Sequence, residues 1–160
     1  MNNYTDNDCK FVAVLNKKIE LPKLLNALGH ISAGLISLVK DVSDVQFLVY
    51  KDGTGTEHPA ISKFPFIVLK ADNGNQIRTA RNAAIAEGIV YNDFVDTMIG
   101  TSAENQLSQT INKQENELEY YAIVFFGHAD KLNAITKKFS LFNVPSNPNG
   151  VNTTGKLMFH

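Results

Sequence analysis

An abrupt change of apolar periodicity near the start of the chain most constrains its fold. Residues 10–15 (KFVAVL) form a short run of β-branched and aromatic side chains, which is typical of a buried strand. From residue 21 to residue 39 the apolar side chains instead recur every three or four positions, which predicts one long helix with Pro22 in its first turn. A buried strand followed closely by an amphipathic helix indicates an α/β fold, in which the helix packs on a sheet.

Later segments continue the alternation of strand and helix patterns. Four more strands are expected at residues 45–50, 64–70, 89–95 and 119–126, and further helices at residues 73–87 and 129–138. Asp72 or Asn73 can cap the helix at 73–87, and Gly88 is placed to stop it. Residues 102–114 are polar and predict either a weak helix or a mobile excursion, while the glycine loop at 52–56 is a connection.

This order of elements predicts a three-layer α/β/α sandwich with a mixed sheet of four to five strands. Strands separated by helices are expected to pair in parallel, whereas the strands at 45–50 and 64–70 have no helix between them and are candidates for antiparallel pairing. Ligands of such sheets usually bind outside the carboxyl ends of the strands. The loops that follow the strands are therefore the places to search for a site.

Length and charge limit the protein to one near-neutral domain. The 160 residues predict a single domain at residues 10–142, with a polar leader at 1–9 and a flexible tail at 143–160. The formal net charge of -1 argues against a protein that mainly holds phosphate backbones. The single cysteine, Cys9, and the lack of any long apolar run predict a cytoplasmic protein that does not cross a membrane.

The helix at residues 21–39 has a polar edge opposite its apolar stripe. At about 100° per residue, five of its residues fall on that edge: Lys23, Asn26, His30, Gly34 and Ser37. A solvated helix face would also be polar. This edge is poor in the usual solvent residues, however, and Gly34 permits another group to approach closely. It is therefore a candidate wall of a functional cleft.

Asp96 directly follows the expected strand at 89–95 and precedes Gly100, Thr101 and Ser102. A carboxylate beside main-chain N–H groups could act as a general base or an orienting group. The same residues are also compatible with an ordinary turn in which Ser102 caps a helix.

Other polar residues give weaker signals. The chain's histidines have no acidic neighbour at the spacing of metal ligands, so neither a metal site nor another cofactor is expected. Arg78 and Arg81 lie three residues apart on a helix, where they could contact phosphate or lie on an exposed edge.

The order of these motifs resembles that of the class II peptidyl-tRNA hydrolases, and more closely that of a group related to them in fold, the domain-of-unknown-function 2000 family. The similarity covers residues 10–142. It rests on the first strand, on PKLLNALGHISAG, on FIVLKADNGNQI, on the strand ending at Asp96 and on AIVFFGHADKLNAITKKFSLF. The resemblance implies a hydrolase-like fold with an active-site cleft that contains Lys23, His30 and Asp96.

The sequence also departs from the hydrolase pattern. Ala27 stands where those enzymes have a glutamine, although Asn26 is adjacent, and Ile99 and Gly100 replace an arginine and a threonine. A threonine of the last strand is replaced by Ala122, and residues 102–118 form an insertion. These changes remove groups that would position an ester and a phosphate, and so argue against peptidyl-tRNA as the substrate.

Three functional hypotheses follow. In the first, the protein hydrolyses an ester or amide of a small or nucleotide-like substrate: Asp96 or His30 activates water, Lys23 stabilises negative charge, and Asn26 with the Gly100 and Thr101 amides holds the carbonyl. In the second, it is a non-catalytic module that binds a small ligand or works as a homodimer. The third hypothesis is peptidyl-tRNA hydrolysis itself, with tRNA as the partner.

Overall fold

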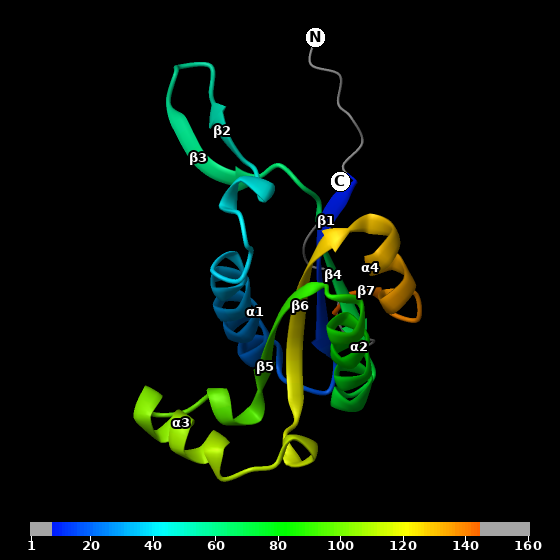
Figure 1. Cartoon of the computed structure of the whole chain (residues 1–160). Helices are drawn as coiled ribbons and strands as arrows, with labels where there is room; N and C mark the ends of the chain where they lie inside the picture. Colours follow the sequence, from blue (N-terminus) through cyan, green and yellow to red (C-terminus); the bar gives the residue numbers. More distant parts are fainter. Residues whose placement is uncertain (1–7, 145–160) are drawn as a thin grey trace, which may run out of the picture.

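The computed structural model describes residues 8–144, which form a five-stranded sheet with helices on both faces (Figure 1). The strands of this sheet are β1 (Cys9–Asn16), β4 (Phe66–Ala71), β5 (Val90–Val95), β6 (Tyr120–His128) and β7 (Ser140–Leu141). Their order is β5-β6-β1-β4-β7. Only the β1–β4 pairing is parallel, and the other three are antiparallel. The predicted α/β class and mixed sheet are confirmed.

The helices form the two outer layers. Figure 1 shows α1 (Leu21–Ile36) on one side of the sheet and α2 (Gly74–Glu87) and α4 (Ala129–Thr136) on the other. The helix α1 buries the central residues of its apolar stripe, Leu24, Ala27, Ile31 and Leu35. The predicted stripe is therefore buried only in part: Leu25 and Leu38 are exposed, and the helix ends three residues before Val39.

The central strand β1 connects both halves of the core. Its side chains point alternately to the two faces, as in any strand. Phe11, Ala13 and Leu15 pack in the core under α1, whereas Val12 and Val14 pack in the core under α2 and α4. Burial on both faces explains why this segment is apolar at nearly every position.

Local signals set the ends of α2 as the sequence predicts. The side chain of Asn73 accepts a hydrogen bond from the main-chain N–H of Gln76 at 3.0 Å, which caps the start of the helix. Gly88 ends the helix in the left-handed conformation, at φ 66°. The small residues Ala80 and Ala84 are buried against the sheet.

The predicted pairing of the strands at 45–50 and 64–70 is wrong. The first of these segments forms β2 (Phe47–Lys51), which pairs with an unexpected strand, β3 (Glu57–Ser62), in a separate two-stranded sheet. This hairpin projects from the body of the molecule (Figure 1). The segment EHPAIS lacks a strand pattern because Pro59 and Ala60 lie in a bulge, with Ala60 at φ 63°.

The expectation that strands separated by helices pair in parallel holds only for β1 and β4. The strand β5 leads through η2 (Asp96–Met98), α3 (Ala103–Ile111) and η3 (Glu115–Glu117) into β6, which returns antiparallel beside it. The polar segment at 102–114 is thus largely a helix, as one of the two interpretations had it. The strand expected at residues 119–126 runs two residues further, because β6 continues to His128.

Most of the expected leader and tail, residues 1–7 and 145–160, lies outside the described part of the chain. Within residues 8–144, no helix combines the length and the apolar character that crossing a bilayer requires.

Candidate functional site

A cleft of about 690 Å³ lies between α1, β5 and the segment that leads into α3. Four of the site residues expected from the sequence line it: Asn26, His30, Gly100 and Thr101. Lys23 and Asp96 are not among its lining residues. The structure therefore brings together the polar edge of α1 and the loop after β5, but without the two charged residues of the expected set.

The wall formed by α1 is held close to β5 by a polar contact. The side-chain amide of Asn92 on β5 donates a hydrogen bond to the main-chain carbonyl of Ile31 on α1 at 3.1 Å. Gly34 leaves room for this amide, since a Cβ at that position would lie 2.7 Å from Asn92 Nδ2. The ring of His30 faces that of Phe94, with 6.3 Å between centroids and 30° between planes. Helix and strand thus form one continuous wall.

The opposite wall is built by the start of α3. Ser102 caps this helix by accepting a hydrogen bond from the main-chain N–H of Asn105 at 3.1 Å. The hydroxyls of Thr97 and Thr110 lie 2.7 Å apart and tie α3 to η2. The side chain of Gln106 reaches toward the Gly100 carbonyl at 3.5 Å. The capped-turn interpretation of Ser102 is therefore confirmed, and this turn forms part of the cleft.

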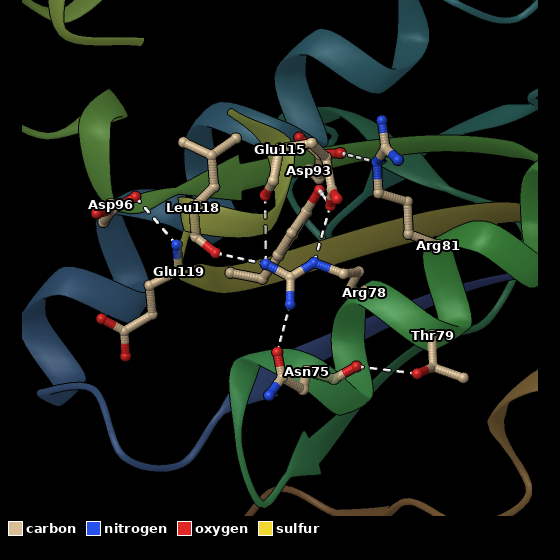
Figure 2. Close-up of polar contacts among 10 residues, drawn as sticks. Asn75, Arg78, Thr79, Arg81, Asp93, Asp96, Glu115, Leu118 and Glu119 are labelled. Atoms are coloured by element: carbon tan, nitrogen blue, oxygen red, sulfur yellow. Dashed lines mark hydrogen bonds and ion pairs between the residues drawn. The ribbon is translucent and has the colours of Figure 1, made fainter. Parts of the chain in front are cut away.

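Asp96 is engaged in a structural contact. Its Oδ2 atom lies 2.8 Å from Lys113 Nζ. Its Oδ1 atom accepts a hydrogen bond from the main-chain N–H of Glu119 at 3.1 Å, as Figure 2 shows. The hydrogen bond to Asp96 raises the pKa of Lys113 above its usual value. The carboxylate thus joins the end of β5 to the segment that returns into β6.

Two lining residues with amide side chains, Asn92 and Gln106, were not expected from the sequence. Asn92 alternates with Phe94 on the face of β5 that meets α1, so the strand period could have assigned it once the neighbouring helix was known. Gln106 lies in a polar segment where nothing in the pattern distinguishes it from its neighbours. With Asn26, these residues give the cleft three side-chain amides.

Arg78 and Arg81 are occupied by carboxylates and main-chain groups. Figure 2 shows Arg78 among Asn75, Glu115 and Leu118, with 2.8 Å between its Nε atom and Glu115 Oε1. Arg81 Nε lies 2.7 Å from Asp93 Oδ2. Both guanidinium groups therefore hold the structure together, which leaves little basis for a phosphate contact.

The ion pair of Arg78 includes a buried tyrosine. The hydroxyl of Tyr120 donates to Glu115 Oε1 at 2.8 Å. Burial, followed by this hydrogen bond, raises the pKa of Tyr120 to about 12. The hydrogen bonds from Tyr120 and Arg78 hold the pKa of Glu115 below its usual value.

Metal-binding and thiol chemistry have little support in residues 8–144. In that range no three His, Cys, Asp or Glu side chains gather as a metal ion would require. Partial burial raises the pKa of the Cys9 thiol, which keeps it protonated near neutral pH.

Comparisons with known proteins extend these observations. A family model described as "Protein of unknown function (DUF2000)" matches residues 9–143. A solved structure of a protein of unknown function from Agrobacterium tumefaciens strain C58 has a TM-score of 0.72, covers 86% of this chain and 100% of that one, and is 17% identical. At that identity the likeness is one of fold. No curated protein matches the chain.

Proposed function

The chain belongs to the DUF2000 family of proteins of unknown function, and from this premise we propose that it binds a small, uncharged polar ligand in the cleft between α1, β5 and α3. The cleft volume of about 690 Å³ is within the usual range for small-molecule sites. Its position beside the end of a strand in an α/β sheet is also a common one for ligands.

The chemistry of the lining carries this proposal. Three amides, Asn26, Asn92 and Gln106, offer both donors and acceptors, and the imidazole of His30 adds one more polar group. The described residues that line the cleft include no lysine or arginine. The one carboxylate among them, Asp93, is paired with Arg81 on the other face of the sheet. Such a lining favours a neutral ligand rich in hydrogen-bonding groups, such as a nucleoside or a blocked amino acid amide, over a phosphate.

A thermal-shift panel of neutral nucleosides and blocked amino acid amides tests this proposal. We expect at least one compound to raise the melting temperature of the protein, and Asn26→Ala to abolish that rise. Asn82→Ala is the matched control, because Asn82 is an exposed asparagine on α2, on the opposite side of the sheet. If Asn26→Ala and His30→Ala respond to the compound as the unmodified protein does, the cleft is not the binding site.

Hydrolysis of an ester or amide is a second candidate function for the same cleft. It is supported by the position of His30, which could activate water opposite the Gly100 and Thr101 segment. Lys23 and Asp96 would then act from beside the cleft, since they lie close in sequence to the lining residues Asn26 and Met98.

An acyl-ester panel separates hydrolysis from simple binding. Turnover that is lost in His30→Ala, and in Lys23→Ala or Asp96→Asn without loss of folding, would favour the enzyme. Binding of an intact compound without turnover would favour the module.

We further propose that the fold is related to that of the class II peptidyl-tRNA hydrolases, because the motifs from β1 to α4 come in the same order. We also propose that the protein is cytoplasmic, because it has a single cysteine. Peptidyl-tRNA has the least support as a substrate, because the net charge is -1 and the lining includes no cationic side chain. If the protein binds tRNA at low salt and this binding weakens steeply as salt is added, peptidyl-tRNA would become the favoured substrate.

A homodimer is a further proposal, supported by the projecting β2–β3 hairpin. Phe47, Val49, Tyr50 and Ile61 on this hairpin are each about half exposed. Two-stranded hairpins are marginally stable alone in water, and this one lies outside the main sheet. We expect light scattering to give the mass of a dimer and Phe47→Lys to give that of a monomer. A monomeric unmodified protein would contradict this proposal.

A further inference from the structure

We infer that the ligand of the cleft is an extended, uncharged peptide segment whose main chain adds to the free edge of β5. This inference rests on the proposed function and specifies its ligand. In the strand order of the sheet, β5 is an outermost strand, paired with β6 alone. Figure 1 shows it at the margin of the sheet, with α1 and α3 nearby. Such an edge presents main-chain N–H and C=O groups that another strand can pair with.

Two hydrogen bonds show which residues of β5 turn their main chain outward. The N–H of Asp96 donates to the Glu119 carbonyl at 2.9 Å, on the side of β6. The N–H of Val95 points the other way and reaches Met98 Sδ at 3.4 Å. Because alternate residues of an antiparallel strand direct their main-chain groups to opposite sides, those of Asp93 and Tyr91 also point away from β6.

The cleft reaches β5 at this outward position. Asn92, Asp93 and Phe94 are three consecutive residues of its lining. The Asp93 carboxylate is held by Arg81 on the other face of the sheet, so Asp93 meets the cleft mainly through its main chain. Met98 occupies the edge beside Val95, and the next outward-facing groups along the strand are those of Asp93. A peptide strand in the cleft would therefore find a donor and an acceptor at this residue.

The remaining lining suits the side chains of such a strand. Alternate residues of an added strand would point to the face of the sheet covered by α1, where Asn26 and His30 lie. The described lining offers no unpaired charged side chain, and a peptide main chain is itself uncharged and rich in amides. Edge pairing and amide contacts thus select the same ligand class.

Titration of the ¹⁵N-labelled full chain with two pools of blocked hexapeptides tests this inference. The first pool is built from Val, Thr, Ser and Asn. The second has the same sequences with N-methyl groups on the third and fourth residues, one on each edge of the peptide. We expect the first pool to shift the amide signals of Tyr91 and Asp93, and the methylated pool to bind at least about 10-fold more weakly, because main-chain hydrogen bonds are lost.

A matched pair of variants locates the contact. Asp93→Pro removes the outward N–H without removing a hydrogen bond to β6, which edge strands tolerate, and should weaken binding by at least about 10-fold. Asp93→Asn gives up the ion pair with Arg81 but keeps the N–H, so it measures what loss of the ion pair alone costs, and Asp93→Pro should bind at least about 10-fold more weakly than Asp93→Asn. If Asp93→Pro does not fold, the methylated pool still decides the question.

The outcomes also separate this inference from the proposed function. Equal binding of the two pools, or no binding of the unmethylated pool, overturns the inference. In either case, a neutral small molecule whose binding depends on Asn26 leaves the proposed function in place. A third outcome is that no small molecule binds in a way that depends on Asn26 or His30, while the unmethylated pool still shifts the amide signal of Asp93. The edge of β5 would then be the binding site, and the cleft would not be a small-molecule site.

Discussion

Gly34 and Asn92 set the distance between α1 and β5. A Cβ at position 34 would lie 2.7 Å from Asn92 Nδ2, and that same nitrogen donates to the Ile31 carbonyl at 3.1 Å. A glycine inside a helix costs about 1 kcal/mol relative to alanine. At Gly34 the missing side chain lets α1 approach Asn92 of β5 closely, and these two elements form one wall of the cleft.

Gly29 and Gly34 on the same helix should respond differently to alanine. A Cβ at Gly29 would have no atom within 4 Å, so Gly29→Ala should raise the free energy of unfolding by about 1 kcal/mol. Gly34→Ala should give a free energy of unfolding about 1 kcal/mol lower than Gly29→Ala does, because Asn92 must give up its hydrogen bond to the Ile31 carbonyl. Urea denaturation measures both, and the shortfall should vanish in an Asn92→Ala background. Equal gains at the two glycines would contradict the contact.

Asp96 should matter more to stability than its partner Lys113. Asp96→Ala removes both the ion pair and the acceptor for the Glu119 N–H, and should lower the free energy of unfolding by about 1–2 kcal/mol. Asp96→Asn keeps an acceptor, and Lys113→Ala removes only a partly exposed pair, so each should have a smaller effect. Denaturation midpoints in urea give the order. A larger loss for Lys113→Ala than for Asp96→Ala would show that the main-chain bond is unimportant.

Tyr120 should make the protein less stable at high pH. Its pKa is raised to about 12 in the folded chain, mainly by burial, whereas a free tyrosine ionises near 10. Between these values the unfolded chain loses the proton and the folded chain keeps it, so stability is intact below pH 10 and falls as pH rises toward 12. The slope contributed by this group is at most about 1.4 kcal/mol per pH unit.

Denaturation midpoints measured between pH 9 and pH 12, together with tyrosinate absorbance, check this prediction. Tyr120→Phe should remove a tyrosine that ionises near pH 12 from the titration and flatten the stability profile above pH 10. An unchanged profile in that variant would assign the effect to another group.

Asp52 should hold the turn of the β2–β3 hairpin together down to low pH. Hydrogen bonds from the Thr54 hydroxyl, His58 and the main-chain N–H groups of Thr54 and Thr56 lower its pKa to about 2. Because the pKa of Asp52 is lower in the folded chain than in the unfolded chain, its carboxylate stabilises the turn fully above the ordinary pKa near 4. This stabilisation is lost as pH falls through 2.

Amide exchange at Thr54 and Thr56 measures the opening of this turn. Protection should decrease below pH 3 in the unmodified chain, and Asp52→Asn should lose protection already at neutral pH. Equal protection in the two proteins at neutral pH would show that the carboxylate does not hold the turn.

Local patterns determined how much of the fold could be predicted. Asn73 and Gly88 bound α2 because cap and stop signals act within one helical turn, and the apolar stripe identified α1 for the same reason. The pairing of β2 with β3 depends on a bulge at Ala60, and the direction of β6 depends on a path through α3. Neither the bulge nor this path produces a periodic pattern of apolar residues in the sequence, so neither could be predicted from it.

The candidate site divides in the same way. Helical spacing brought Asn26 and His30 to one edge, and the end of a strand pointed to Gly100 and Thr101. Asn92 joins them because β5 lies beside α1, a long-range fact. The pairing of Asp96 with Lys113 likewise depends on how the segment after α3 returns.

The central position of β1 also determines when the sheet can be completed during synthesis. This strand leaves the ribosome first among those of the sheet, yet its antiparallel partner β6 comes almost last, with Cys9 opposite His128. Until β6 emerges, β1 can pair only with β4, and the main-chain groups on its other edge have no partner strand. The apolar side chains of β1 on both faces, such as Phe11 and Val12, also lack part of their core during this time. Growing chains are therefore exposed to aggregation for most of the translation time, and dependence on chaperones should be greatest just before residues 120–128 appear.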